Sequence, residues 1–231
     1  MRVLRSEDRF VTMADGIRTE HCFSFGAHFD PLNVGFGALQ ACNDEHLDLR
    51  SGYPLHRHLD TEIVTWVLSG TLVHEDSTGA RHEVPAGSVQ RLSAGHGVEH
   101  TERNGGGEPL RFVQMWLRPD TDGAQPAYAC GMPSLRPGGW TDVVGGDAAL
   151  ACGTAGAVLR VAELPGHAHL DLLPAPRCFV FVATGSVDAS GSGVLQEGDS
   201  LMLGGQTLRL TARKPARLLA WALPADQAAS T

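Results

Sequence analysis

The sequence predicts an all-β protein made of two related halves, each a sandwich or barrel of antiparallel strands. Short runs rich in β-branched and aromatic residues recur along the chain, as at 63–68, 71–73 and 110–117. Turn-forming residues separate these runs, and helical periodicity is nearly absent from the 231 residues. Many short strands at this spacing are typical of β-sandwiches and β-barrels.

In the first half, each predicted strand is ended by a turn. Gly70, Gly79 and Gly87 follow short polar or proline-containing stretches, and residues 104–107 read Asn-Gly-Gly-Gly. Glycine and asparagine adopt the backbone angles that tight turns require, so these positions are expected to reverse the chain. Short helices are the alternative at 38–43 and at the C-terminus.

The strand pattern is lost over residues 118–140, which are expected to connect the two halves. We therefore predict an N-terminal domain over 1–119, a linker over 120–140 and a C-terminal domain over 141–231. Residues 225–231 are small and polar and are expected to fray. Strand patterns return in the second half at 158–162, 178–182, 200–203, 208–212 and 218–223.

Two short motifs carry the candidate chemistry: His56-Arg57-His58 with Glu62 after it, and His100-Thr101-Glu102. Alternate side chains of a strand leave the same face, which predicts one inward set from each motif. Imidazole and carboxylate groups suit Fe(II), Mn, Ni, Cu or Zn, and no thiolate is present to form a closed structural zinc site. Three roles stay open for Glu62: a fifth ligand, an acceptor that orients a ligand histidine, or a buried acid.

An internal repeat relates the halves, because residues 66–72 match 181–187 and residues 85–89 match 196–200 more loosely. In the second half the ligand positions are filled by Asp171, Leu173, Arg177, Thr211 and Arg213. An alternative register, shifted by 111 residues, would instead place His167 and His169 where His56 and His58 stand. Since arginine is itself a cation, this half is predicted to bind no metal. Six other histidines are predicted to lie on the surface or in loops: His46, His74, His82, His96, His167 and His169.

Composition excludes several classes of function. The net charge of -8 argues against direct binding to nucleic acid or to an anionic membrane. No apolar run reaches the roughly 18 residues that a membrane helix needs, and the first residues lack the apolar core of a secretory signal. The five cysteines are widely spaced and include no CxxC motif, which favours a reducing, cytoplasmic setting.

The spacing of one set of residues resembles the two cupin motifs: Gly52, His56, His58, Glu62, Gly70, Gly87, Gly95 and His100. Departures from the general cupin spacing fit the pirin family. The chain resembles the pirins in several linked motifs, at 23–26, 30–31, 35–39, 43–44, 65–70, 74–79 and 93–102. The similarity is strong over 20–118 and mainly architectural over 140–231.

The resemblance implies a bicupin with metal only in its N-terminal barrel, held by His56, His58, His100 and Glu102, with Glu62 nearby. One divalent transition metal is expected, Fe(II) as the first choice and Mn, Ni, Cu, Zn or Co as alternatives. The implied activity is that of a quercetin 2,3-dioxygenase, which cleaves a flavonol-like substrate with O2 and releases carbon monoxide. Glu102 or Glu62 would accept the proton of the substrate hydroxyl. The alternative is a metal- and redox-sensing regulatory protein that acts through a protein partner, and a monomer is expected in either case.

Overall fold

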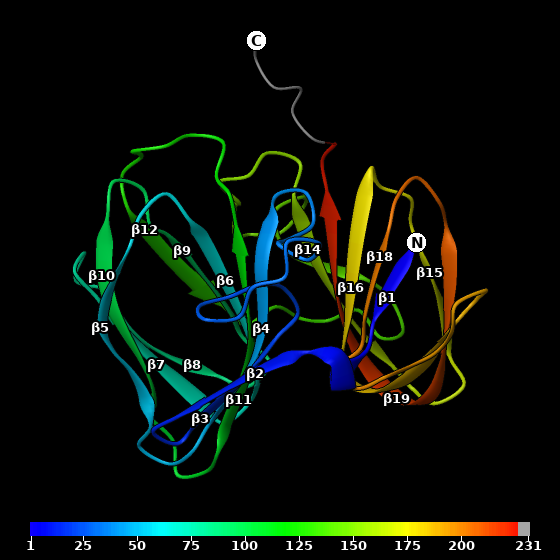
Figure 1. Ribbon diagram of the computed structural model, residues 1–231, viewed down its shortest axis with the longest axis horizontal. Coiled ribbons are helices and arrows are strands. Elements are labelled where there is room, and N and C mark those ends of the chain that lie inside the picture. Colours follow the sequence, from blue (N-terminus) through cyan, green and yellow to red (C-terminus); the bar gives the residue numbers. More distant parts are fainter. Residues whose placement is uncertain (226–231) are drawn as a thin grey trace.

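The computed structural model describes residues 1–225 and confirms the all-β prediction. Two lobes lie side by side, the N-terminal half in blue to green and the C-terminal half in yellow to red (Figure 1). The one helix within these residues, the 3-10 turn η1 (Ser6–Asp8), is far too short to cross a membrane. The strands are β1 (Arg2–Leu4), β2 (Phe10–Ala14), β3 (Ile17–His21), β4 (Leu39–Leu47), β5 (Gly52–His58), β6 (Glu62–Ser69), β7 (Thr71–Asp76), β8 (Arg81–Pro85), β9 (Val89–Ser93), β10 (Val98–Asn104), β11 (Leu110–Leu117), β12 (Ala127–Gly131), β13 (Thr141–Val144), β14 (Val158–Leu164), β15 (His169–Leu172), β16 (Arg177–Ala189), β17 (Gly193–Gln196), β18 (Ser200–Leu203) and β19 (Leu208–Leu223).

The N-terminal half is a sandwich of two antiparallel sheets. One has seven strands in the order β12-β9-β6-β11-β4-β3-β2, and the other has four in the order β5-β10-β7-β8. Apolar side chains from both sheets, including Leu47, Leu72 and Phe112, pack between them at one end. Because side chains alternate along a strand, polar residues that share the inward phase meet in the interior of the sandwich.

The C-terminal half repeats this plan with fewer, longer strands. β16 and β19 change register part-way along, so each takes the place of two strands of the first half. Gly70 and Gly185 occupy matching bends, with φ of 75° and 77°. A Cβ there would lie 2.9 Å from the Leu110 Cα, or 2.0 Å from the Pro215 carbonyl oxygen, so only glycine fits. The predicted repeat is confirmed at these positions.

Two edge strands pair outside the domain limits that the sequence predicts. β1, at the start of the chain, pairs with β18 of the C-terminal half, and β12, from the segment 118–140, pairs with β9 of the N-terminal half. The prediction that 118–140 holds no strand is therefore wrong over Ala127–Gly131, where pairing with β9 along its whole length outweighs the weak local pattern. The domain limits at residues 119 and 141 remain a proposal, with β1 paired to the C-terminal half and β12 of the linker paired to the N-terminal half.

The short helix considered at 38–43 is also wrong, because these residues begin β4. This strand lies between β3 and β11, with side chains buried on both faces, so its sequence lacks the alternation of a half-exposed strand. The C-terminal helix and most of the fraying segment fall beyond residue 225, outside the described residues.

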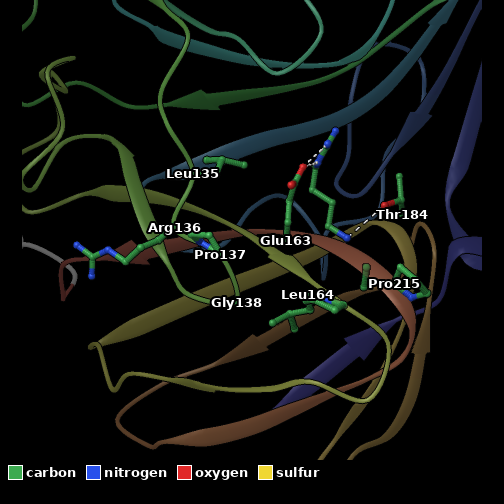
Figure 2. A pocket seen from close by; sticks show the side chains of 11 residues that line it. Leu135, Arg136, Pro137, Gly138, Glu163, Leu164, Thr184 and Pro215 are labelled. Atoms are coloured by element: carbon green, nitrogen blue, oxygen red, sulfur yellow. Dashed lines mark hydrogen bonds and ion pairs between the residues drawn. The ribbon is translucent and has the colours of Figure 1, made fainter.

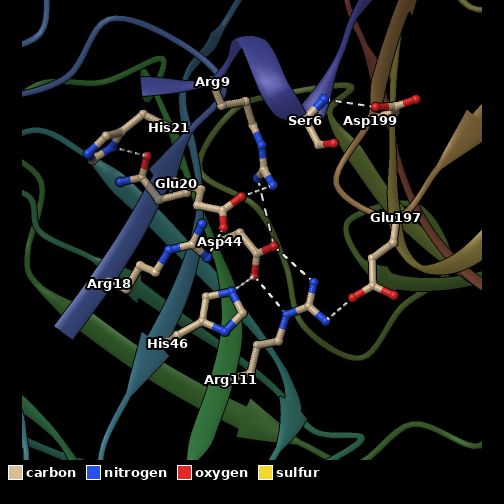
Figure 3. Close-up of polar contacts among 11 residues, drawn as sticks. Ser6, Arg9, Arg18, Glu20, His21, Asp44, His46, Arg111, Glu197 and Asp199 are labelled. Atoms are coloured by element: carbon tan, nitrogen blue, oxygen red, sulfur yellow. Dashed lines mark hydrogen bonds and ion pairs between the residues drawn. The ribbon is translucent and has the colours of Figure 1, made fainter. Parts of the chain in front are cut away.

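A single apolar cluster joins the halves, with Trp66 and Met115 on one side and Phe179 and Trp221 on the other. The Trp221 indole N–H lies 3.1 Å from the Met115 sulfur. Beside this cluster, charged side chains also bridge the halves (Figure 3): Arg111 of β11 bonds Asp44 in its own half at 2.9 Å and Glu197 of the other half at 2.6 Å. The two sandwiches therefore pack on each other through both apolar and ionic contacts.

Candidate metal centre

The predicted histidines converge because two neighbouring strands carry them. β5 pairs with β10, and His56 lies directly opposite His100. An irregularity in this pairing follows His100, between it and Glu102. The ligand atoms of His56, His58 and His100 lie within 4.8 Å of one another, so one cation could contact all three. The structure thus brings together the three imidazoles singled out in the sequence.

The protonation of these rings suits a metal. The Nδ1 of His56 lies 2.8 Å from the Pro54 carbonyl oxygen, which can only accept, so this nitrogen carries the proton and Nε2 keeps its lone pair. His100 is 1% exposed, and neither of its ring nitrogens has a hydrogen-bond partner among residues 1–225. Burial lowers the pKa of His58 and of His100 to about 4, so both rings are neutral at pH 7. Buried imidazole nitrogens without partners are costly unless something binds them, and a transition metal fits.

Glu102 is held between two amides of the opposite sheet. Gln90 Nε2 donates to its Oε1 at 2.6 Å and Gln114 Nε2 donates to its Oε2 at 2.7 Å. Each amide is itself oriented by a donor on its oxygen: the Trp116 indole N–H at 2.9 Å for Gln114, and the Tyr128 hydroxyl at 3.0 Å for Gln90. An indole N–H can only donate, so the Gln114 oxygen must face it and the NH2 must face the carboxylate.

His74, His100 and the Gln114 of this clamp together keep Glu102 ionised inside the protein. Burial alone would raise the pKa of its carboxyl, but the contacts with His74 and Gln114 and the nearby His100 outweigh burial and lower the pKa to about 2. Glu102 is therefore a carboxylate at neutral pH. A negative ligand next to neutral imidazoles would offset part of the charge of a divalent cation.

His74, predicted to lie on the surface or in a loop, is fully buried, and that prediction is wrong. Its Nε2 bonds the Asp76 carboxylate at 2.9 Å, and its Nδ1 lies 4.0 Å from Glu102 Oε1. Burial opposes a charge on the ring, but the two carboxylates raise its pKa above the ordinary value. With His100 and Glu102 it forms a second cluster of potential ligands. The missed signal is the alternation along β7, where residue 72 is also buried and inward.

Glu62 belongs to neither of these two clusters of potential ligands. The chain turns after His58, with Asp60 at φ 43°, and Glu62 begins β6 in the other sheet. The prediction that Glu62 continues the strand face of the histidines is therefore wrong. Its buried carboxylate accepts a hydrogen bond from the backbone N–H of Gly153 at 3.1 Å, which ties β6 to the second half of the chain.

A row of polar residues, invisible in any one segment, crosses the inner face of the seven-stranded sheet. Register places His21, Asn43, Gln114, Thr65 and Gln90 side by side on five adjacent strands. Each stands alone among apolar neighbours or in a charged stretch, so single-strand patterns give no sign of the row. The sequence signal that could have found it is a glutamine at an inward position of an otherwise apolar strand.

A cavity of about 340 Å³ opens between this row and the histidines. His56, His58 and Glu102 line one side, and the rings of Phe25, Tyr53 and Trp116 form an aromatic wall. Trp116 packs edge-on to His58, with ring centroids 4.9 Å apart. The remaining polar wall comes from β3 and β4: His21, Asn43 and Glu45.

A second hollow, of about 440 Å³, lies beside β14, β16 and β19 (Figure 2). Two of its charged groups pair with each other, since Arg217 bonds Glu163. It contains no cluster of metal-ligating side chains among the described residues. The absence of metal from the C-terminal half stays a prediction.

Most of the other histidines predicted to lie at the surface are exposed; His46 is half-buried, and His169, predicted to lie in a loop, begins β15. His82 and His96 are exposed in the first half, and so are His167 and His169 in the second. His169 lies opposite Thr211, in the pairing that His56 makes with His100. The residue in the position of His56 is therefore His169, and the prediction that Asp171 fills it is wrong, whereas Thr211 fills the position of His100 as predicted.

Known proteins resemble the chain in both sequence and structure. The family model described as Pirin matches residues 3–117. A putative quercetin 2,3-dioxygenase of Mycobacterium tuberculosis is 38% identical over 97% of this chain and 96% of that protein, and the quercetin 2,3-dioxygenase of Escherichia coli K12 is 43% identical over 47% of each. The crystal structure of the E. coli pirin YhhW in complex with nickel(II) superposes with a TM-score of 0.90, at 28% identity over 97% of this chain and 99% of that one. These matches confirm the predicted bicupin architecture, and the chain belongs to the pirin family.

Proposed function

We propose that this protein is a metal-dependent dioxygenase that cleaves a flavonol such as quercetin with O2. One observation carries the proposal: buried His100, with neither ring nitrogen satisfied among residues 1–225, clusters with His56 and His58, and these two line an aromatic-walled cavity. The names of the curated relatives support the same reaction.

The proposed ligands are His56, His58, His100 and Glu102, holding one divalent transition metal. Fe(II) is our first choice, and the nickel bound to YhhW supports a transition metal in this family. When bound, the ion would act as a Lewis acid toward substrate oxygens and supply the redox chemistry that O2 requires. The donor set of neutral imidazoles and one carboxylate suits Fe, Ni, Mn, Cu, Co or Zn, whereas Ca and Mg prefer oxygen cages.

The cavity suits a planar polyphenol. Its volume of about 340 Å³ lies within the range of small-molecule sites, roughly 300–1,000 Å³. Phe25, Tyr53 and Trp116 offer aromatic surface to a flat ring system. The polar wall opposite provides partners for hydroxyl groups, so the cavity can orient the substrate.

The test is an aerobic assay on protein reconstituted with Fe(II) or, separately, Ni(II). We expect quercetin absorbance to fall and one CO to be released for each quercetin consumed. His100→Ala should lose both metal and turnover, whereas His169→Ala, an exposed histidine in the other half, should match the wild type. Metal-loaded wild-type protein that leaves quercetin no less stable in air than free metal does would refute the activity.

A further inference from the structure

A second buried carboxylate, Glu45, lines the same cavity as the histidines. It lies on β4 of the seven-stranded sheet and is 3% exposed. β4 is paired on both sides, with β3 and β11, so the position of this side chain is fixed by a rigid sheet. The charged stretch from Asn43 to His46 resembles a solvated surface strand in sequence, and only the sandwich places Glu45 inside.

Two hydroxyl groups hold Glu45 by one of its oxygens. Thr19 Oγ1 donates to Oε2 at 2.5 Å, and the Tyr53 hydroxyl donates to the same oxygen at 2.6 Å. The other oxygen, Oε1, has no hydrogen-bond donor among residues 1–225. A carboxylate anchored on one side and free on the other is arranged to receive a proton from a ligand in the cavity.

The two other candidate carboxylates are less suited to that step. Both oxygens of Glu102 accept short hydrogen bonds from amides, and this residue is a proposed metal ligand. Glu62 bonds the backbone of Gly153 and does not line the cavity. Among the carboxylates of the described residues, Glu45 alone lines this cavity without belonging to a ligand cluster.

The electrostatic environment agrees with this geometry. Burial raises the pKa of Glu45 to about 7, against the opposing donors Thr19 and Tyr53, and the charges of Glu102 and Asp44 add to the rise. The titratable groups that influence it are Tyr53 from β5, Glu102 from β10 and Asp44, the preceding residue of β4. A general base works best when its pKa lies near the operating pH.

We propose that Glu45 is the catalytic base of this site, with Thr19 and Tyr53 as its positioning residues; this rests on the proposed function. The O–H bond of the substrate hydroxyl breaks, its proton forms a new O–H bond with Oε1, and the electron pair stays on the substrate oxygen as an oxyanion. No oxidant takes part in this step, and the neutral acid returns the proton to solvent after product leaves.

The experiment compares wild-type protein, Glu45→Gln and the matched surface control Glu83→Gln, an exposed glutamate on β8. Bound metal is quantified first, then the absorption spectrum of quercetin bound without O2, then kcat/KM in air. Ionisation of the flavonol shifts its absorption to longer wavelength, so the spectrum reports the proton transfer without turnover. We expect equal metal in all three proteins, ionised flavonol in the wild type and the control, and neutral flavonol in Glu45→Gln. The kcat/KM of Glu45→Gln should fall by about 100-fold or more.

The outcomes separate the two proposals. A wild type that does not consume quercetin refutes the proposed function. An active wild type with an equally active Glu45→Gln, or with ionised flavonol in that variant, overturns the role of Glu45 alone. Should Glu45→Gln fail to fold, Glu45→Asp decides: its carboxylate is shorter by one methylene, so the ionised fraction and kcat/KM should both drop with metal retained, and unchanged values would overturn the proposal.

Discussion

Replacing Gln114 by leucine tests how the protein holds Glu102, the carboxylate among the proposed metal ligands. The substitution keeps the approximate volume but removes the 2.7 Å hydrogen bond to Glu102 Oε2 and leaves the Trp116 indole N–H without its acceptor. A hydrogen bond to a charged group contributes about 1.5–3 kcal/mol, which corresponds to roughly 10- to 150-fold in an equilibrium constant. Part of this loss falls equally on the metal-free protein, where Glu102 is also buried, so the change in metal affinity lies toward the lower limit. We expect the metal Kd to rise about 10-fold, the lower end of the range typical of partners that orient ligands.

Two measurements separate the effect of Gln114→Leu on metal binding from its effect on the stability of the metal-free protein. Competition with a chelator of known affinity gives the metal Kd, and thermal unfolding of the metal-free protein gives the stability loss, at about 2–4 °C for each kcal/mol in a chain of this size. Gln125→Leu makes the same chemical change at an exposed glutamine that bonds His96, and should alter neither value. A Gln114→Leu protein with wild-type Kd and wild-type Tm would show that the amide does not support Glu102, and the reasoning would fail.

Three further outcomes are expected. The kcat/KM should rise with pH around pH 7, because the base Glu45 must be unprotonated to work. Tyr53→Phe removes a hydrogen-bond donor that lowers the pKa of Glu45, so in a pH–rate profile this rise should move to higher pH. An unchanged profile would contradict the positioning role of Tyr53. His74→Phe keeps the stacking on the neighbouring tyrosine but removes a contact that lowers the pKa of Glu102, so acid should release metal at a higher pH in a titration followed by metal analysis, and an unchanged midpoint would count against the contact. Gly153→Ala would place a Cβ 2.5 Å from the Glu62 carboxylate, so the Tm of the variant should drop by several degrees while its metal affinity stays unchanged. A wild-type Tm would show that Glu62 moves aside at no cost in stability.

The sequence predicts those residues of the site whose spacing along a single strand puts them on one face. His56 and His58 alternate on one strand, His100 and Glu102 alternate on another, and the family motifs place these strands together. His74 obeys the same alternation but carries no motif, so its burial depends on which face of β7 meets the opposite sheet. That choice is made by long-range pairing, which no window of sequence contains.

Pairing also explains the errors in the fold. β4 is buried on both faces between two neighbours, and its mixed apolar and charged residues hide the strand pattern. β12 is short and stands in a segment rich in proline and glycine, yet β9 offers it a free edge. The predicted strand face of Glu62 is wrong because the chain turns at Asp60, and a turn made by one left-handed residue leaves no strong signal in the sequence.

The two carboxylates of the cavity illustrate how one sandwich separates two chemical roles. Glu102 and Glu45 are both buried, so desolvation raises the pKa of each. The difference comes from the donors: Glu102 has an amide on each oxygen and a histidine close by, whereas Glu45 has two hydroxyl donors on a single oxygen. One acid is thereby kept charged to pH values near 2 and suits a metal ligand, while the other titrates near 7 and suits proton transfer. Environments that push the pKa values of paired acids apart are how a single site performs both tasks, and here the opposing sheets of one sandwich supply them.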